Sequence, residues 1–271
     1  MKDYRPPRRG TRTDPAPTPA VPRNGPAVGP WKSLAWVAAL AVVVAFGWFG
    51  WSRISRIGIR EVRVEGAVVS NVDRIRTAAR IDLDTLLVAV APSLVDDRVR
   101  RHPWVEDAST RRLPDGTVSI RIEERTPVLL ALSSDGRPAY YLDREGHRMP
   151  FAAGHSFPVP LLRGLTEGYH PVRPVQHAAV RALVAVLPDL EPEVDALLSE
   201  FHVDESGGLS LVTTPGSYDR PLLVRLGKDR FDERLARLRA FWDQAVLTRP
   251  DVRYAQVDLR FEGQIITRES S

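Results

Sequence analysis

The chain has 271 residues, with 38 Lys and Arg, 34 Asp and Glu, and no cysteine. The lack of cysteine excludes a disulfide framework, thiolate metal ligands and thiol catalysis. The pI of about 9.7 arises largely in residues 1–33, which hold seven bases and two acids (7 − 2 = +5), while the remainder holds 31 bases and 32 acids. The basic pI therefore does not indicate a nucleic-acid-binding domain.

Residues 1–33 also contain eight prolines and few apolar residues. A segment of this composition cannot bury enough apolar surface to offset the entropy lost on ordering. We expect a disordered, basic, proline-rich tail on the cytoplasmic side of a membrane.

The run from Leu34 to Trp51 is apolar and uncharged. Eighteen helical residues span about 27 Å, close to the hydrocarbon thickness of a bilayer. Tryptophans stand near both ends of the run, where an indole ring can bury its body and keep its N–H in water. We interpret residues 34–52 as a single transmembrane signal anchor. The expected membrane-interface anchors are Trp31, Trp36, Trp48 and Trp51.

Two other interpretations of this run are less consistent with its composition. A buried core helix would normally carry a polar face, which the run lacks. A cleaved secretory signal has an apolar region of about 7 to 15 residues ending at a small-x-small site, whereas this run ends in Gly-Trp-Phe-Gly-Trp-Ser-Arg.

The orientation of the anchor does not follow from charge alone. The whole tail favours a cytoplasmic N-terminus, but near the run Arg23 and Lys32 are outnumbered by four arginines on the other side, and short-range charge bias favours the opposite topology. Those four are Arg53, Arg56, Arg60 and Arg63. A short tail, an anchor and a long following domain match the common export layout, so we expect the bulk of the chain to be extracytoplasmic.

A strand and two helical segments are predicted after the anchor. Apolar alternation over 57–64 predicts a strand that ends in the Glu65-Gly66 turn. Ser70 is the expected N-cap of the first helix. The second segment covers about 84–101, and Pro92 is expected to interrupt it.

A hairpin completes this unit. Residues 105–111 predict one strand, the Leu-Pro-Asp-Gly sequence at 113–116 predicts a turn, and apolar alternation over 118–122 predicts the second strand. The resulting order, β-α-α-β-β, is a compact two-layer α+β unit.

Four short motifs occur in order within residues 57–127. They are Val-Arg-Val-Glu-Gly at 62–66, Pro-Trp-Val at 103–105 with Ala108 and Arg111 after it, Leu-Pro-Asp-Gly-Thr at 113–117, and Ile-Arg-Ile-Glu-Glu-Arg-Thr-Pro at 120–127. Their order and spacing resemble the POTRA domain of the FtsQ/DivIB family of bacterial cell-division proteins. The resemblance implies a POTRA domain at 57–126.

The region 127–268 predicts a mixed α/β domain. Strands are expected over 139–143, which runs into the turn 144–147, over 222–227, and in a hairpin of 201–203 with 209–212. The segments 157–164 and 254–263 are similar to the proline-leucine-glycine segment and closing strand of the FtsQ-type β domain. The resemblance covers about 34–268.

Two helices are predicted in this region. Pro174 suits the first turn of a helix that ends at Leu187. Asp229 is the expected cap of a helix over 231–242, which offers Glu233 and Arg237 as an i,i+4 pair.

Catalytic motifs are absent from the sequence. It contains no Gly-x-Ser-x-Gly elbow, no Walker phosphate loop and no His-Glu-x-x-His pair. Its six histidines show no close metal-ligand spacing, and adjacent acids such as Asp96-Asp97 do not face each other. We expect no catalytic, cofactor-binding or metal-binding residue and no enzyme activity; the competing hypothesis is an anchored hydrolase.

The end of the chain is the candidate binding region. Val257, Leu259 and Phe261 are expected to face the core. The β-prone segment 263–267 would either form an ordinary hairpin with 252–261 or leave an edge for a partner strand. The family resemblance implies that this region binds FtsB in complex with FtsL, through Arg260, Phe261 and Gly263.

The resemblance implies a non-enzymatic scaffold of the division machinery in the cytoplasmic (inner) membrane at the septum. Such a protein would recruit other division proteins, partly through its POTRA domain and transmembrane segment, and help control septal peptidoglycan synthesis. Neither nucleic acid nor a small-molecule substrate is expected. The alternative is a POTRA-containing component of secretion or outer-membrane assembly, which would need a C-terminal barrel of many alternating strands.

Overall fold

A computed structural model describes residues 30–54, 56–152, 154–215, 221–249 and 252–269. Most of the expected tail lies outside these residues. Backbone contacts separate a unit ending at Ser52 from a unit that begins at Arg53.

Helix α1 (Pro30–Ile54) contains the apolar run. Its side chains are described over 35–50, and those at 35–49 are exposed, Trp36 and Trp48 by 75% and 77%. The side chains of Trp31 and Trp51 lie outside the described residues. Among the described residues, no helix has the length and apolar character needed to cross a membrane.

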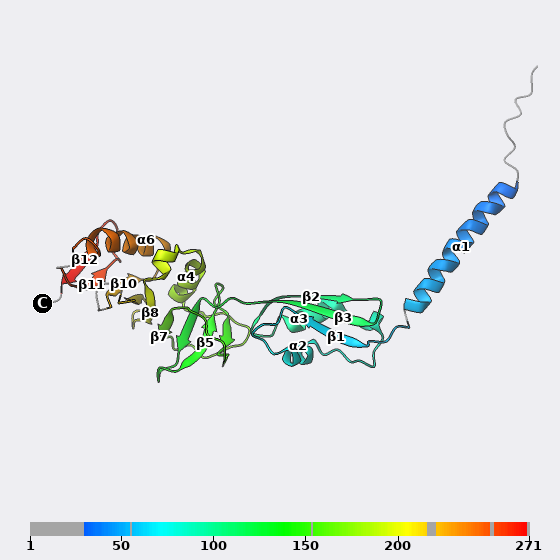
Figure 1. Ribbon diagram of the computed structural model, residues 1–271, viewed down its shortest axis with the longest axis horizontal. Coiled ribbons are helices and arrows are strands. Elements are labelled where there is room, and N and C mark those ends of the chain that lie inside the picture. Colours follow the sequence, from blue (N-terminus) through cyan, green and yellow to red (C-terminus); the bar gives the residue numbers. More distant parts are fainter. Residues whose placement is uncertain (1–29, 55, 153, 216–220, 250–251, 270–271) are drawn as a thin grey trace, which may run out of the picture. The chain divides into compact units, whose positions relative to one another are not determined.

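The small domain is a three-stranded sheet with two helices (Figure 1). Its elements are β1 (Glu61–Glu65), α2 (Val72–Ala79), the short 3₁₀ helix η1 (Leu87–Ala89), α3 (Pro92–Val99), β2 (Val105–Arg112) and β3 (Thr117–Glu124). Strand β3 lies in the centre, parallel to β1 and antiparallel to β2. Ile75, Val99 and Ile120 are completely buried between the helices and the sheet. The expected β-α-α-β-β order is confirmed.

The helix caps of this domain differ from the sequence predictions. Asn71, not Ser70, caps α2, because its side-chain oxygen accepts from the backbone N–H of Asp73 at 2.8 Å. Ser70 instead donates its hydroxyl to Glu124. Pro92 begins α3 rather than interrupting a longer helix, a position where its missing N–H costs no hydrogen bond.

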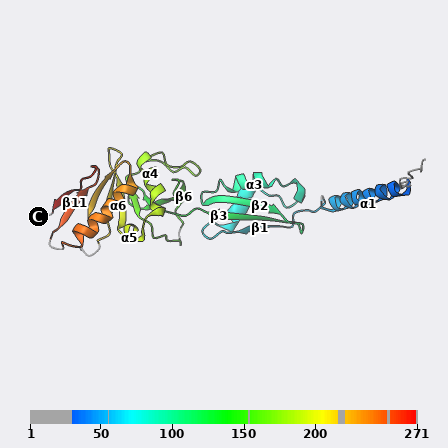
Figure 2. The same cartoon turned by 90° about the horizontal axis from the view of Figure 1, so that it is seen from above.

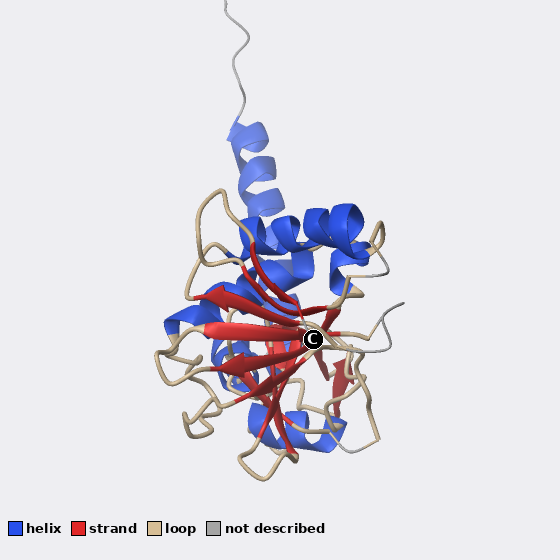
Figure 3. Ribbon diagram, turned by 90° about the vertical axis from the view of Figure 1, so that its left-hand side faces the viewer, coloured by secondary structure: helices blue, strands red, loops and turns tan. Residues whose placement is uncertain are grey.

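The large domain contains a mixed nine-stranded sheet. Its strands are β4 (Leu129–Leu132), β5 (Pro138–Leu142), β6 (Arg148–Pro150), β7 (Leu161–Arg163), β8 (Leu198–Val203), β9 (Leu209–Thr213), β10 (Leu223–Gly227), β11 (Tyr254–Asp258) and β12 (Ile266–Glu269). Their spatial order is β12-β11-β10-β9-β8-β7-β4-β5-β6. Strands fan out in Figure 3, as the regular twist between neighbouring strands requires.

Helices cover one face of this sheet (Figure 2). They are α4 (Ala178–Val186), the 3₁₀ turn η2 (Leu187–Asp189), α5 (Pro192–Asp195) and α6 (Phe231–Phe241), which continues into a π-helical turn, η4 (Trp242–Val246). Leu183 from α4 and Leu238 from α6 pack with Phe201, Val224 and Val257 in one core, and all five are completely buried. The predicted hairpin of β8 and β9 is confirmed.

In the large domain the predicted start of the first helix and the predicted cap of the second were wrong. Helix α4 begins at Ala178, four residues after Pro174, and the ring nitrogen of His177 caps it by accepting from the Val180 N–H at 3.3 Å. Helix α6 follows Arg230, which has a left-handed φ of 51° and supplies no side-chain cap. Asp229 pairs instead with Arg234 at 2.9 Å.

A small aromatic cluster joins the two domains. Trp104, after α3, packs against Tyr141 of β5 with ring centroids 6.0 Å apart, and Met149 of β6 completes the buried cluster. The indole N–H of Trp104 donates to the carbonyl of Pro150 at 3.2 Å. The Pro-Trp-Val motif therefore has a structural role at the domain junction.

Glu124, at the end of β3, holds the loop that leads into α2. Its carboxylate accepts the backbone N–H groups of Val69 and Ser70, at 2.9 and 2.7 Å, as well as the Ser70 hydroxyl. Burial opposes ionisation, but these hydrogen bonds outweigh it and lower the pKa of Glu124 below its ordinary value of 4.5. The stabilisation is therefore complete above the ordinary pKa and is lost as pH falls through the lower, folded-state pKa.

We expect Glu124→Gln to destabilise the protein at pH 7 by about 1 kcal/mol, because the amide offers one acceptor oxygen instead of two. The difference from the unmodified chain should shrink as the pH falls below 4.5, because Glu124 then takes up a proton more readily in the unfolded chain than in the folded one. Thermal unfolding at pH 7 and pH 3.5 measures both effects. The control is Glu123→Gln, at an exposed neighbouring position. If Glu124→Gln lowered the unfolding temperature equally at both pH values, the role of ionised Glu124 would be contradicted.

Candidate functional site

Strand β12 lies at one edge of the large sheet and pairs only with β11 among the described strands. The pairing is antiparallel, with Val257 opposite Thr267 and Asp258 opposite Ile266. All four residues of β12 are exposed. Of the two alternatives that the sequence allowed, the hairpin is therefore the one that forms. The outer side of its second strand remains available for another strand.

The turn between β11 and β12 is held by Arg237 of α6. Its guanidinium donates to the carbonyl of Phe261 at 3.0 Å and to that of Gln264 at 2.5 Å, and it approaches the Leu259 carbonyl at 3.5 Å. Arg237 thus does not form the predicted pair with Glu233. A guanidinium can serve several carbonyls because it presents its donors in a rigid planar arrangement.

Gly263 gives this turn its backbone conformation. Its φ is +65°, in the left-handed region that side chains rarely adopt. A Cβ at this position would meet no atom within 4 Å. The requirement for glycine therefore comes from the backbone angle rather than from crowding.

Arg260 is fixed by Asp258, two residues earlier. Its Nε lies 2.9 Å from Oδ1 and its Nη2 lies 2.6 Å from Oδ2 of Asp258. This pairing lowers the pKa of Asp258 and raises that of Arg260. Arg260 is thereby held across the end of β11.

Phe261 is exposed rather than buried. β11 ends at Asp258 and the chain bends at 261–263, so the alternation that buries Val257 and Leu259 stops before Phe261, which is 48% exposed. The Arg260 guanidinium lies 5.9 Å from its ring centroid. The prediction that Phe261 packs in the core was wrong, and the ring is available for contact with another molecule.

A polar row crosses the face of the sheet that the helices leave open. The strand registers align one residue from each of six strands: Arg163, His202, Ser210, Arg225, Asp258 and Ile266. Beside this row, a groove of about 470 Å³ is lined by residues that include two acids, Asp204 and Glu205, and two arginines, Arg225 and Arg260. Arg260 is followed directly by Phe261 in the turn that leads into the edge strand β12.

The sequence predicted Arg260, Phe261 and Gly263 as binding residues, and the structure places them beside Arg225, Arg237 and Asp258, which were not predicted. The alternation of Arg225 with buried Val224 and Leu226 was a signal that its side chain faces away from the core. No local pattern could have assigned Arg237, because its carbonyl partners lie 22 or more residues further along the chain.

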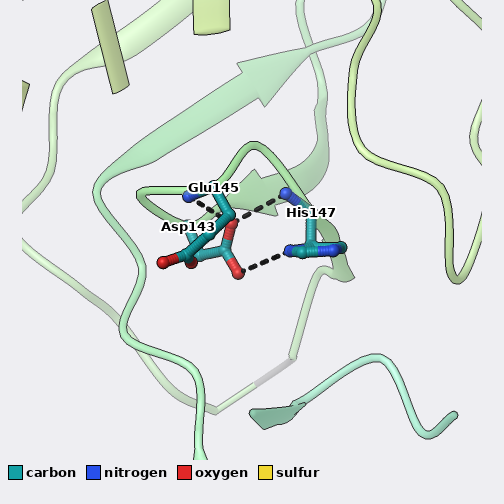
Figure 4. A group of neighbouring side chains, drawn as sticks. All are labelled: Asp143, Glu145 and His147. Atoms are coloured by element: carbon teal, nitrogen blue, oxygen red, sulfur yellow. Dashed lines mark hydrogen bonds and ion pairs between the residues drawn. The ribbon is translucent and has the colours of Figure 1, made fainter. Parts of the chain in front are cut away.

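A second cluster, at the turn between β5 and β6, has the donor set of a metal site. One ligand atom each from Asp143, Glu145 and His147 lies within 4.8 Å of the others (Figure 4). Sequence reasoning missed the cluster, although its three residues alternate within five positions.

Asp143 in this cluster already has a full set of partners. Oδ1 accepts the backbone N–H groups of Glu145 and His147 at 3.0 and 2.7 Å, and Oδ2 accepts Arg125 at 2.6 Å. Burial opposes ionisation, yet the hydrogen bonds from His147 and Arg125 lower the pKa of Asp143. Asp143 organises the turn and its link to Arg125.

The histidine nitrogen Nδ1 also has partners inside the cluster. It lies 3.0 Å from Nη1 of Arg125 and 3.2 Å from Oδ2 of Asp143, so it accepts from Arg125 in one tautomer of His147 and donates to Asp143 in the other. Burial, together with the charge of Asp143, raises the pKa of Glu145, because both disfavour its charged form. The cluster is an arginine-centred ion pair rather than a cation site.

Substitution of Arg237 tests its hold on the turn. We expect Arg237→Gln to speed amide hydrogen exchange over residues 259–267 and to cost about 1–2 kcal/mol, because two charge-assisted hydrogen bonds are lost. Hydrogen-exchange mass spectrometry measures the local effect. The control is Arg239→Gln on the same helix, which removes only a partly exposed pair with Asp243. Unchanged protection of the turn in Arg237→Gln would refute the role of Arg237.

Metal addition tests the Asp143 cluster. We expect neither Zn²⁺ nor EDTA to shift the thermal unfolding temperature, because Arg125 occupies the acceptor atoms that a cation would need. Saturable Zn²⁺ binding that His147→Gln abolishes would contradict this assignment.

Comparison with known families accounts for both domains. A family model described as "POTRA domain, FtsQ-type" matches residues 57–125. A second, described as "FtsQ/DivIB, C-terminal related", matches residues 126–268. The two matches adjoin at the end of β3, where the three-stranded sheet gives way to the nine-stranded sheet.

Whole-chain relatives agree with these matches. The chain is 42% identical over 229 residues to the cell division protein FtsQ of Rhodothermus marinus, with 84% of each chain covered. It is 39% identical over 233 residues to the FtsQ of Salinibacter ruber, covering 84% of this chain and 89% of that protein. The FtsQ of Mycolicibacterium smegmatis is 29% identical over 239 residues, covering 88% and 66%. The chain belongs to the FtsQ/DivIB family of cell-division proteins.

Proposed function

We propose that this protein is a non-enzymatic scaffold of the division machinery that binds an FtsB- and FtsL-type pair at the β12 edge. Membership of the FtsQ/DivIB family supports a role in division. The observation that carries the binding site is the free outer side of β12 beside exposed Phe261. Recruitment of these partners would help control septal peptidoglycan synthesis.

The edge would bind its partner by strand addition. The backbone groups on the outer side of β12 would pair with an extended partner segment, and side chains beside the strand would select it. Phe261 provides an exposed aromatic contact. Arg225 and Arg260 line the adjoining groove together with Asp204 and Glu205, so the groove suits a polar partner segment with side chains of both charges.

We also propose that residues 34–52 anchor the protein in the cytoplasmic membrane at the septum. The N-terminus would then be cytoplasmic and both domains extracytoplasmic. The run is uncharged, and Trp36 and Trp48 are exposed near opposite ends of the described part of α1. Exposed apolar side chains along 35–49 support a helix that needs a nonpolar solvent.

A recognition role is favoured over catalysis. The Asp143 cluster, where acid and imidazole groups meet, is occupied by Arg125. The C-terminal features are a strand edge, an exposed ring and paired arginines, which suit binding more than bond cleavage. The POTRA domain and the anchor would contact other division proteins.

Proline substitution in β12 tests strand addition. Neighbouring residues of an antiparallel strand point their N–H groups to opposite sides, so one of Ile266→Pro and Thr267→Pro removes an N–H bonded to β11 and the other removes an outward N–H. We expect the variant that loses the outward N–H to keep the unfolding temperature of the unmodified chain. The same variant should bind a purified FtsB–FtsL pair at least tenfold more weakly. Calorimetry and circular dichroism measure the two properties.

Matched alanine variants separate the backbone from the side chain. Ile266→Ala and Thr267→Ala keep both N–H groups, so they should retain most of the binding. Phe261→Ala should weaken binding by loss of the aromatic contact. The strand-addition proposal fails if both proline variants bind as tightly as their alanine counterparts.

A further inference from the structure

An apolar surface lies on the loop between α2 and α3 in the small domain. Leu83, Leu86 and Val88 are exposed by 54%, 46% and 39%. Leu87, between the last two, is buried in the core. Three large apolar side chains within six residues of one loop exceed the scattered exposure that is normal for a soluble domain. We call Leu83, Leu86 and Val88 the apolar loop.

Hydrogen bonds keep the apolar loop in this arrangement. The N–H of Leu87 donates to the carbonyl of Ile57 at 2.8 Å, and the N–H of Ile59 donates to Thr85 at 3.1 Å. Arg112 of β2 donates to the carbonyl of Val88 at 3.1 Å. The loop is thus tied to residues 57–59 and to β2, and its apolar side chains point outward from an ordered backbone.

The strand that pairs with the loop follows the anchor closely in the chain. Helix α1 ends at Ile54, and Ile57 comes three residues later. Three residues of extended chain reach about 10 Å, and the headgroup layer of a bilayer adds about 5–7 Å beyond the hydrocarbon core. Residues 57–59, and the apolar loop bonded to them, are therefore tethered within reach of any bilayer that holds the end of α1.

The charges around the apolar loop indicate whether lipid headgroup charge or the apolar interior of the bilayer would attract it. Arg56, Arg60 and Arg112 are exposed at this end of the domain, and so are Asp82, Asp84 and Asp115. Three bases and three acids give no net attraction for anionic headgroups. Apolar burial is left as the driving force.

We propose that the apolar loop inserts its three side chains into the interfacial layer of the phospholipid bilayer. The loop would give the small domain a second membrane contact, beside the covalent one, and so limit its rotation relative to the membrane. This inference rests on the proposed anchoring through residues 34–52.

The test uses the natural absence of cysteine. A single cysteine is introduced in the full chain at Leu86, labelled with a nitroxide, and reconstituted in nanodiscs of phosphatidylethanolamine and phosphatidylglycerol. The matched control is a label at Val68, which is 79% exposed. Val68 follows β1, whereas the apolar loop pairs with the segment before β1, so the two labels mark opposite ends of one strand. A third label, at Val43 in α1, reports anchoring.

We expect the label at Leu86 to show high accessibility to oxygen and low accessibility to a water-soluble nickel complex, as the label at Val43 should. The label at Val68 should show the reverse. Replacing phosphatidylglycerol by phosphatidylcholine should leave the result at Leu86 unchanged, because charge does not drive the contact. Leu83→Ser with Val88→Ser should raise nickel accessibility at Leu86 severalfold.

Two outcomes would overturn the proposal separately from the anchor. If Val43 is in lipid and Leu86 is as open to nickel as Val68, the anchoring stands and the loop contact is wrong. If Leu86 becomes shielded only after an FtsB–FtsL pair is added, the loop binds a protein partner and the lipid contact is also wrong. A label at Val43 that is open to nickel would refute the anchoring itself.

Discussion

Burial of one face of the nine-stranded sheet under α4 and α6 determines where the large domain can bind. Side chains alternate along each strand, so the residues that pack under these helices, such as Phe201, Val224 and Val257, force their neighbours onto the other face. Among the described residues, α4 and α6 lie together on one side of the large sheet in Figure 1. The packing of the helices on one face therefore places the polar row and the groove on the opposite face, beside the β12 edge.

Arginines of α6 connect the helix layer to the ends of the strands. Arg234 donates to the carbonyl of Leu226, near the end of β10, and to that of Asp229, just after β10, while Arg237 donates to carbonyls in the turn after β11. Backbone groups at strand ends lack ladder partners, and leaving them unpaired near the core would be costly. The same helix that buries the sheet therefore also fixes the turn that presents Phe261.

Periodic features of the fold were predictable from the sequence. Alternation over β3, and the turn residues between β8 and β9, predicted strands that form as expected. The predicted burial of a side chain failed where it depended on the residue at which a strand ends. Phe261 continues the alternation of Val257 and Leu259, but β11 ends first and the ring is exposed.

Helix caps and side-chain clusters were harder to predict, because several neighbouring residues have side chains that could act as the cap or the ligand. Ser70 and Asn71 both have capping side chains, and the choice was made by Glu124, which is over fifty residues away and engages Ser70. Asp143 and His147 resemble ligands until Arg125 is brought beside them by β3 and β5. Such assignments depend on tertiary neighbours that local sequence does not specify.

The short length of β12 has opposing effects on binding. An edge strand of four residues with Arg268 and Glu269 at its end discourages uncontrolled pairing with other strands. It also exposes few outward backbone groups, and each hydrogen bond contributes only about 1 kcal/mol net. Main-chain pairing alone would therefore give a weak complex. Under the proposed function, Phe261 and the charged side chains of the groove would supply the remaining binding energy, so the affinity and selectivity of this edge should reside mainly beside the strand rather than in it.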